Sequence, residues 1–140
     1  MTSLDAAGPV LDARGRVLDR VVVRGLRAVG RHGVLAFERA TGQPFGLDVA
    51  LHLDTREAAA ADDLAATVDY GALGERLTAL LAGEPVQLVE TLADRAARTC
   101  LAASERVAAV DVVVHKPRAP LTVPFDDVEL VVRRTRDDLP

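Results

Sequence analysis

The sequence predicts an α+β domain, a four-stranded antiparallel sheet with two helices on one face. Apolar and polar residues alternate strictly from Phe45 to Asp54, the middle of the chain repeats apolar residues at helical spacing, and two more alternating segments close it. The element order is therefore ββααββ, and strands that are neighbours in sequence pair most simply as hairpins. With 140 residues, the chain has the length of one domain.

Two strands are predicted at the start of this domain. The β-branched run VVVRGLRAV begins after Arg20 and predicts a strand that ends near Gly30, where a tight corner at 31–33 follows. The alternation that begins at Phe45 is typical of a strand with one buried face.

Two helices are predicted next. The first carries one apolar stripe and is stopped by a glycine and a proline in the segment 83–85; its stripe residues are Leu73, Leu77, Leu80 and Leu81. The second repeats apolar residues every four positions, at Leu88, Leu92, Ala96 and Cys100.

Two strands complete the sheet, on either side of a proline-rich turn at 116–124. Their apolar residues are Val110, Val112, Val114, Val128, Leu130 and Val132. The alternating partners are polar, so the second face of the sheet is expected to meet water or to line a central channel made by several subunits. These polar residues are Asp48, His52, Asp111, His115, Glu129 and Arg133.

Residues 1–18 have neither a strand nor a helix period and are expected to form a disordered tail before a domain at 19–136. The net charge of −4 with scattered arginines argues against a nucleic-acid partner. The chain has no run of eighteen apolar residues, so no membrane span is expected. The single cysteine cannot form an internal disulfide, which favours a cytoplasmic location.

Four polar residues stand at predicted element boundaries: Glu38, Tyr70, Glu90 and Lys116. Each has an ordinary explanation when it is taken alone, as a solvated loop carboxylate, a packing phenol, a helix-capping carboxylate or a solvated strand-end ammonium. Together they supply an acid, a base, a phenol and an ammonium, which is a set for moving protons without a metal. This combination indicates an enzyme.

The motifs around these residues carry a family resemblance. They are GRHGVLAFER with a following GQ, ADDLAATVDYGAL, LVETLADR and HKPRAP, in this order between about Arg20 and Arg134. In this respect the chain resembles the dihydroneopterin aldolase family of folate biosynthesis. The resemblance implies the tunnelling fold, rings of four subunits that commonly stack into a homo-octamer, a cytoplasmic enzyme and no cofactor.

The resemblance also implies a reaction. A lyase of this family cleaves 7,8-dihydroneopterin by a retro-aldol step into 6-hydroxymethyl-7,8-dihydropterin and glycolaldehyde, with C2' epimerisation as a side activity. Glu90 is the position that would accept two parallel hydrogen bonds from the pterin edge, and the backbones of Val68 and Val89 would contact the ring.

The catalytic roles are implied in the same way. Lys116 would act as general acid/base through a water and not as a Schiff-base nucleophile, because the pterin imine can itself take up the electrons. Glu38 would orient Lys116 and the water. Tyr70 would reach in from an adjoining subunit and exchange a proton with the enol intermediate, so the site would lie at a subunit interface.

Other readings of the same residues remain open. A 2'-epimerase of dihydroneopterin triphosphate shares this architecture and would need extra cations, for which Arg31, Arg39 and Arg118 lie close to the motifs. Zinc-dependent relatives need several converging ligands, and three histidines with one cysteine are a poor basis for that, so no metal is expected. A non-catalytic ring-forming pterin-binding module would lack Lys116 or Glu38.

Overall fold

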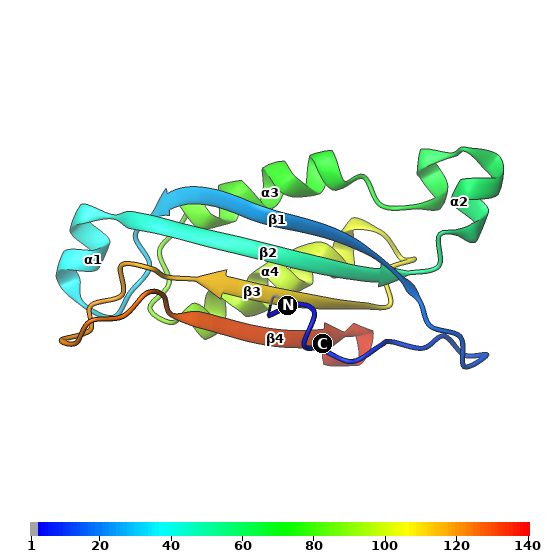
Figure 1. The fold of residues 1–140 in the computed structure, drawn as a ribbon. Helices are drawn as coiled ribbons and strands as arrows, with labels where there is room; N and C mark the ends of the chain where they lie inside the picture. Colours follow the sequence, from blue (N-terminus) through cyan, green and yellow to red (C-terminus); the bar gives the residue numbers. More distant parts are fainter. Residues whose placement is uncertain (1–2) are drawn as a thin grey trace.

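The computed structural model describes residues 3–140 as one sheet with two long helices behind it (Figure 1). The strands are β1 (Asp19–Gly30), β2 (Gln43–Leu53), β3 (Ala109–His115) and β4 (Glu129–Thr135). The helices are α1 (Ala36–Thr41), α2 (Arg56–Ala61), α3 (Tyr70–Ala82) and α4 (Val89–Ala103), with short 3₁₀ turns η1 (Leu64–Ala66) and η2 (Arg136–Asp138). None of the helices in residues 3–140 has both the length and the apolar character needed to cross a bilayer.

The sheet has the order β1-β2-β3-β4, and every neighbouring pair is antiparallel. This arrangement confirms the predicted hairpin pairing of β1 with β2 and of β3 with β4. The long connection through α3 and α4 brings β3 back beside β2, with Val49 opposite Val112. The two strands in the middle of the sheet are therefore β2 and β3.

One core lies between the sheet and the pair α3 and α4. Most residues predicted to face inward from β2, β3 and the two helices are buried in it, including Phe45, Leu47, Val49, Leu51, Leu73, Leu77, Leu81, Leu92 and Ala96. The prediction was wrong for Leu88, which precedes α4 and is 48% exposed, and Leu80 is only partly buried. Cys100 belongs to this core, and burial raises the pKa of its thiol to about 12. Asp69 begins α3 by accepting a hydrogen bond from the backbone of Ala72, at 3.1 Å.

Two short helices were not predicted. Both α1 and α2 have six residues, which is less than two turns, so neither can display a repeating apolar stripe. Glu38 lies in the first turn of α1 and is buried, so its ordinary explanation as a solvated loop carboxylate does not hold. The tight corner at 31–33 therefore leads into a short helix.

The face of the sheet that points away from α3 and α4, called here the outer face, is polar as predicted. Its residues form two hydrogen-bonded groups. His52 pairs with Asp111 at 2.7 Å, and Arg133 holds the same carboxylate at 2.6 Å. His115 lies between two carboxylates, with Asp48 at 2.7 Å and Asp127 at 2.8 Å.

Residues 3–18, called here the N-terminal segment, lie on the outer face instead of leaving the domain as the disordered tail that the sequence indicated (Figure 1). Leu4 is 1% exposed and packs on an apolar patch of the face formed by Ala50, Val113 and Val22. Leu11 and Val17 form an isolated bridge around a turn that is closed by the Asp12 carboxylate. Sequence periodicity could not reveal this, because the segment has no regular element of its own.

Candidate active site

The corner between β1 and α1 is built around His32. This side chain is 1% exposed; its Nε2 lies 2.7 Å from the carbonyl of Leu81, and its Nδ1 lies 3.1 Å from the backbone nitrogen of Val86. Since the Val86 N–H donates, Nδ1 accepts and Nε2–H donates to Leu81, which is the neutral imidazole. Burial lowers the pKa of His32 and favours that form. His32 therefore ties the corner to the end of α3 and to the loop before α4.

Glu38 is packed against Gly33, the last residue of this corner. A Cβ at position 33 would lie 2.3 Å from the Glu38 carboxyl carbon, so only glycine allows this approach. The Glu38 carboxylate accepts hydrogen bonds from the Leu35 backbone at 3.3 Å and from the Gln43 side chain at 3.0 Å. The carboxylate is therefore fixed in one position before any ligand arrives.

Lys116 completes a buried ion pair. Its Nζ lies 2.7 Å from Oε2 of Glu38, and the lysine is 9% exposed. The backbone N–H of Lys116 donates to Val128, and its ammonium stands 5.9 Å from the centre of the Phe45 ring. Burial raises the pKa of Glu38, but the hydrogen bonds from Lys116 and Leu35 and the charge of Lys116 outweigh this and lower it. The ionised form of Glu38 is therefore favoured.

Val89 and Glu90 lie at the same end of the molecule as this ion pair. They open α4, and the loop that leads into α4 is tied to the corner because the Gly33 N–H donates to the carbonyl of Val86 at 2.9 Å. Glu90 is exposed, whereas Val89 is partly buried against the core. The Glu90 carboxylate is thus free to meet a ligand from solvent.

Tyr70 and Val68 lie at the other end of α3. Tyr70 begins this helix and Leu81, which contacts His32, is almost its last residue, so about 16 Å of helix axis separates the two. Figure 1 shows α3 between α1 at one end of the sheet and α2 at the other. Tyr70 is 63% exposed, while Val68 is buried in the core. One chain therefore does not bring Tyr70 to the pair of Glu38 and Lys116.

A hollow of about 210 Å³ opens beside Glu38, lined in part by Phe37, Gln43 and Arg118. Sites for small ligands usually measure about 300–1,000 Å³, so this hollow is too small to enclose a bicyclic ring with a side chain. Taken alone, it is therefore not a complete site for such a ligand. We call it the Glu38 hollow.

The structure adds three residues to those expected at this site. Gln43 donates to Glu38, while its own Oε1 is buried with no hydrogen-bond partner among the described residues. Phe45 faces the Lys116 ammonium, and Arg118 lines the hollow. The sequence showed Gln43 only as the GQ that follows the first motif, and nothing in its spacing indicated that its side chain turns back to α1.

A different group of side chains has the chemistry to hold a metal ion. The possible ligand atoms of His115, Asp127 and Glu129 lie within 4.8 Å of one another. Burial lowers the pKa of His115, but its hydrogen bonds to Asp48 and Asp127 outweigh this and raise it. Both ring nitrogens of His115 already contact carboxylates, Asp48 at 2.7 Å and Asp127 at 2.8 Å, so in this structure the group forms a hydrogen-bonded cluster.

The family model that matches the chain is FolB, dihydroneopterin aldolase, over residues 21–133. The chain belongs to the dihydroneopterin aldolase family. This confirms the family predicted from the four motifs. The match includes Glu38, Tyr70, Glu90 and Lys116, and it leaves out the N-terminal segment.

Curated members of this family are similar along nearly their whole length. The dihydroneopterin aldolase of Streptomyces coelicolor is 57% identical over 119 residues, which is 85% of this chain and 99% of the relative. The dihydroneopterin aldolase of Bacillus subtilis is 37% identical over 119 residues, with the same two coverages of 85% and 99%.

Solved structures of the family have the same fold. The Escherichia coli dihydroneopterin aldolase in complex with neopterin is 26% identical and has a TM-score of 0.75, with 84% of this chain and 99% of that chain covered. The Burkholderia thailandensis dihydroneopterin aldolase bound to guanine is 27% identical and has a TM-score of 0.68, with 86% and 93% covered.

Proposed function

We propose that this protein is a 7,8-dihydroneopterin aldolase that forms 6-hydroxymethyl-7,8-dihydropterin and glycolaldehyde in tetrahydrofolate biosynthesis. Membership of the family supports the reaction, and the buried pair of Lys116 and Glu38 beside an open hollow is the observation that carries it. The step needs a base for the 2'-hydroxyl proton. The bond between C1' and C2' then breaks, and its electrons move into the pterin imine, which becomes an enamine.

Lys116 is the proton carrier of this proposal. In its amine form Lys116 takes up the 2'-hydroxyl proton through a bridging water, and the resulting ammonium later returns a proton through water to C1' to give the hydroxymethyl product. Glu38 orients the Lys116 side chain and balances its charge, and the 2.7 Å contact between Nζ and Oε2 supports this role. No covalent bond between Lys116 and the substrate is needed, because the pterin ring is the electron sink.

Glu90 is the proposed anchor for the ring. Its carboxylate is exposed at the end of the molecule that holds the pair, where the pterin N–H and NH₂ groups can donate to it in parallel. The backbone of Val89, one residue before it, would contact the same edge. Two charge-assisted hydrogen bonds of this kind fix orientation as well as position.

Tyr70 and the backbone of Val68 are proposed to come from a neighbouring subunit. The length of α3 between Tyr70 and the His32 corner and the small volume of the Glu38 hollow both support a site that two chains complete. Tyr70 would exchange a proton with the enol intermediate there. A ring of four subunits, alone or stacked as an octamer, would repeat this site at every junction, and we propose that it works in the cytoplasm without metal or cofactor.

A turnover assay with two substrates tests the proposal. Purified protein given 7,8-dihydroneopterin in the presence of a chelator should release glycolaldehyde, and borohydride added during turnover should leave the mass of the protein unchanged. Turnover of dihydroneopterin triphosphate with no reaction of the free compound would instead establish the epimerase. A borohydride-trapped adduct on Lys116 would contradict the absence of a Schiff base.

A further inference from the structure

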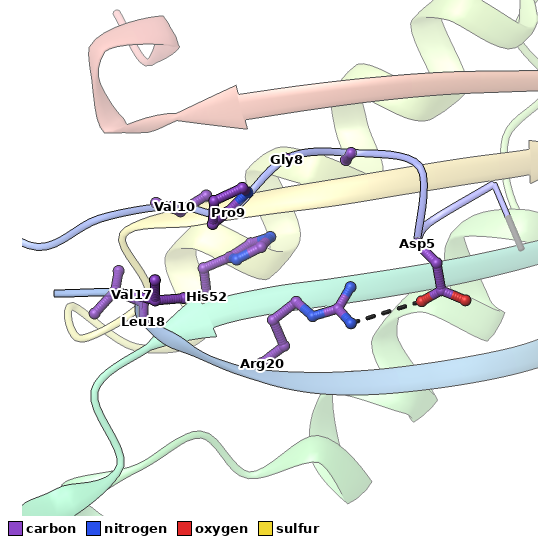
Figure 2. Close-up of a pocket in the computed structure, with 9 residues that line it drawn as sticks. Asp5, Gly8, Pro9, Val10, Val17, Leu18, Arg20 and His52 are labelled. Atoms are coloured by element: carbon purple, nitrogen blue, oxygen red, sulfur yellow. Dashed lines mark ion pairs between the residues drawn. The ribbon is translucent and has the colours of Figure 1, made fainter. Parts of the chain in front are cut away.

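A second cavity lies far from the Glu38 hollow, between the N-terminal segment and the outer face of the sheet. It has a volume of about 210 Å³, and its lining includes Gly8, Val17, Arg20 and His52 (Figure 2). His52 pairs with Ala109 at the first residue of β3, whereas Lys116 follows the last, so about 20 Å of strand separates the two places. This cavity is therefore distinct from the proposed active site.

His52 forms the floor of the cavity. The side chain is 1% exposed, and its Nε2 lies 2.7 Å from Oδ2 of Asp111. Burial raises the pKa of Asp111, but its hydrogen bonds with His52 and Arg133 outweigh this and lower it, so the carboxylate is ionised. A carboxylate can only accept, and the His52 Nε2 therefore donates.

In the neutral imidazole this bond leaves the other ring nitrogen of His52 as an acceptor. Nδ1 is buried and has no hydrogen-bond partner among the described residues. Buried acceptors are almost always paired, because an unpaired one loses its bond to water without replacement. Figure 2 shows the imidazole under the backbone of Gly8 and Pro9, within the cavity. An occupant that donates a hydrogen bond to Nδ1 would satisfy it.

Arg20 supplies positive charge to the same cavity. Its guanidinium lies 3.6 Å from the Asp5 carboxylate, a distance that makes an ion pair and not a hydrogen bond. The guanidinium has five N–H donors, more than one carboxylate oxygen can engage. Figure 2 shows the Arg20 side chain on the same side of the sheet as the His52 ring. The cavity thus combines one buried acceptor with a cation that recognises carboxylates.

We propose that this cavity binds a small α-hydroxycarboxylate. The hydroxyl donates to Nδ1 of His52, and the neighbouring carboxylate pairs with Arg20. At about 30 Å³ for each water, the cavity has room for about seven waters, which is enough for a molecule of this class. Because Gly8 and Val17 lie outside the part matched by the family model, the site is a feature added to the family domain.

The probe is L-lactate, and the readout is the imidazole ¹⁵N resonances of the full-length protein with labelled histidine. The chain has three histidines, so His32 and His115 serve as internal references. Lactate should shift His52 Nδ1 in a saturable way and leave His32 unchanged. Acetate, which has the carboxylate without the hydroxyl, should bind at least about tenfold more weakly.

Two variants and one control test whether lactate binds in this cavity. Arg20→Met should weaken lactate binding by about tenfold or more, whereas Arg27→Met, an exposed arginine of the same strand outside the cavity, should not change it. Val17→Phe should fill the cavity and abolish binding while the His52 Nε2 resonance keeps its value. Unchanged His52 resonances with lactate, equal affinity for acetate, or full binding in Val17→Phe would each overturn the proposal.

Discussion

Lys116 is the only lysine of the chain, and it is held against Glu38 instead of projecting into solvent. We expect Lys116→Ala to lower the cleavage rate by about 10²–10⁴-fold, the usual contribution of a general acid or base. Pterin binding should persist, because Glu90 is the proposed anchor of the ring. Single-turnover kinetics together with ligand titration separate the two effects.

An exposed cation far from the site provides the control for this variant. Arg14 lies in the Asp12 turn of the N-terminal segment, so Arg14→Ala should retain full cleavage activity. If Lys116→Ala kept its rate and lost only its affinity for the pterin, Lys116 would be a binding residue and the acid/base assignment would be wrong.

His115 should make stability depend on pH. Its pKa is raised above the ordinary 6.5 by Asp48 and Asp127, although burial opposes this. A raised folded-state pKa means that the stabilisation is complete below the unfolded pKa and is lost as pH rises through the folded one. The urea midpoint should therefore fall as the pH rises above about 6.5, the ordinary histidine pKa.

Comparison with His115→Gln isolates this effect. The variant cannot titrate at this position, so the difference in unfolding free energy between the two proteins should shrink steadily across the same pH range. Parallel pH profiles for both proteins would show that His115 does not contribute to the dependence.

Sequence spacing did not reveal which of these polar residues touch. Glu38 and Lys116 are far apart along the chain, and only the pairing of β2 with β3 brings their ends together. The family motifs marked both residues, but the burial of the pair depends on Gly33 and on α1, which carry no periodic signal. For the same reason the contact of Gln43 with Glu38 could not be predicted.

At the scale of elements, the corner before α1 depends on a glycine. Gly33→Ala places a methyl group 2.3 Å from the Glu38 carboxyl carbon, so the carboxylate and Lys116 must move. A displacement of about 1 Å at a catalytic pair can cost about 10²-fold in rate, and we expect a loss of this size in kcat. Steady-state kinetics measure it.

The matched control is Gly8→Ala, where an added Cβ meets no atom within 4 Å. This variant should keep the kcat of the unmodified protein. Normal activity of Gly33→Ala with normal pterin affinity would mean that the position of Glu38 is not critical for the reaction.

The long elements were predictable and the short ones were not. In β2 and α3 the apolar period is repeated often enough to define the buried side, and the core follows those predictions. Six residues in α1 or α2 are too few for a period. The N-terminal segment packs through Leu4 on a patch of small and branched residues on the outer face, which is a property of the folded sheet and not of the segment.

At the scale of the whole molecule, the separation of Tyr70 from Lys116 predicts complementation between subunits. Tyr70→Ala and Lys116→Ala should each be nearly inactive alone. Mixed in equal amounts during refolding, they should recover about one quarter of the normal activity, because random assembly gives about one junction in four with both intact residues.

The corresponding control is the double variant Tyr70→Ala/Lys116→Ala mixed with unmodified protein. In this mixture a junction is active only where both contributing chains are unmodified. The mixture should therefore also have about one quarter of the activity of the same total amount of unmodified protein. No recovery in the mixture of single variants, with assembly verified by light scattering, would place Tyr70 and Lys116 in a site within one chain.

The burial of Cys100 makes site-specific fluorescence labelling practical. It is the only cysteine, and a thiol with a pKa of about 12 carries almost no reactive thiolate at neutral pH. A cysteine introduced on the surface would therefore take up a maleimide dye alone, without prior removal of the native residue. Donor and acceptor dyes at the two ends of α3, placed on different chains, would report by energy transfer that the chains have assembled.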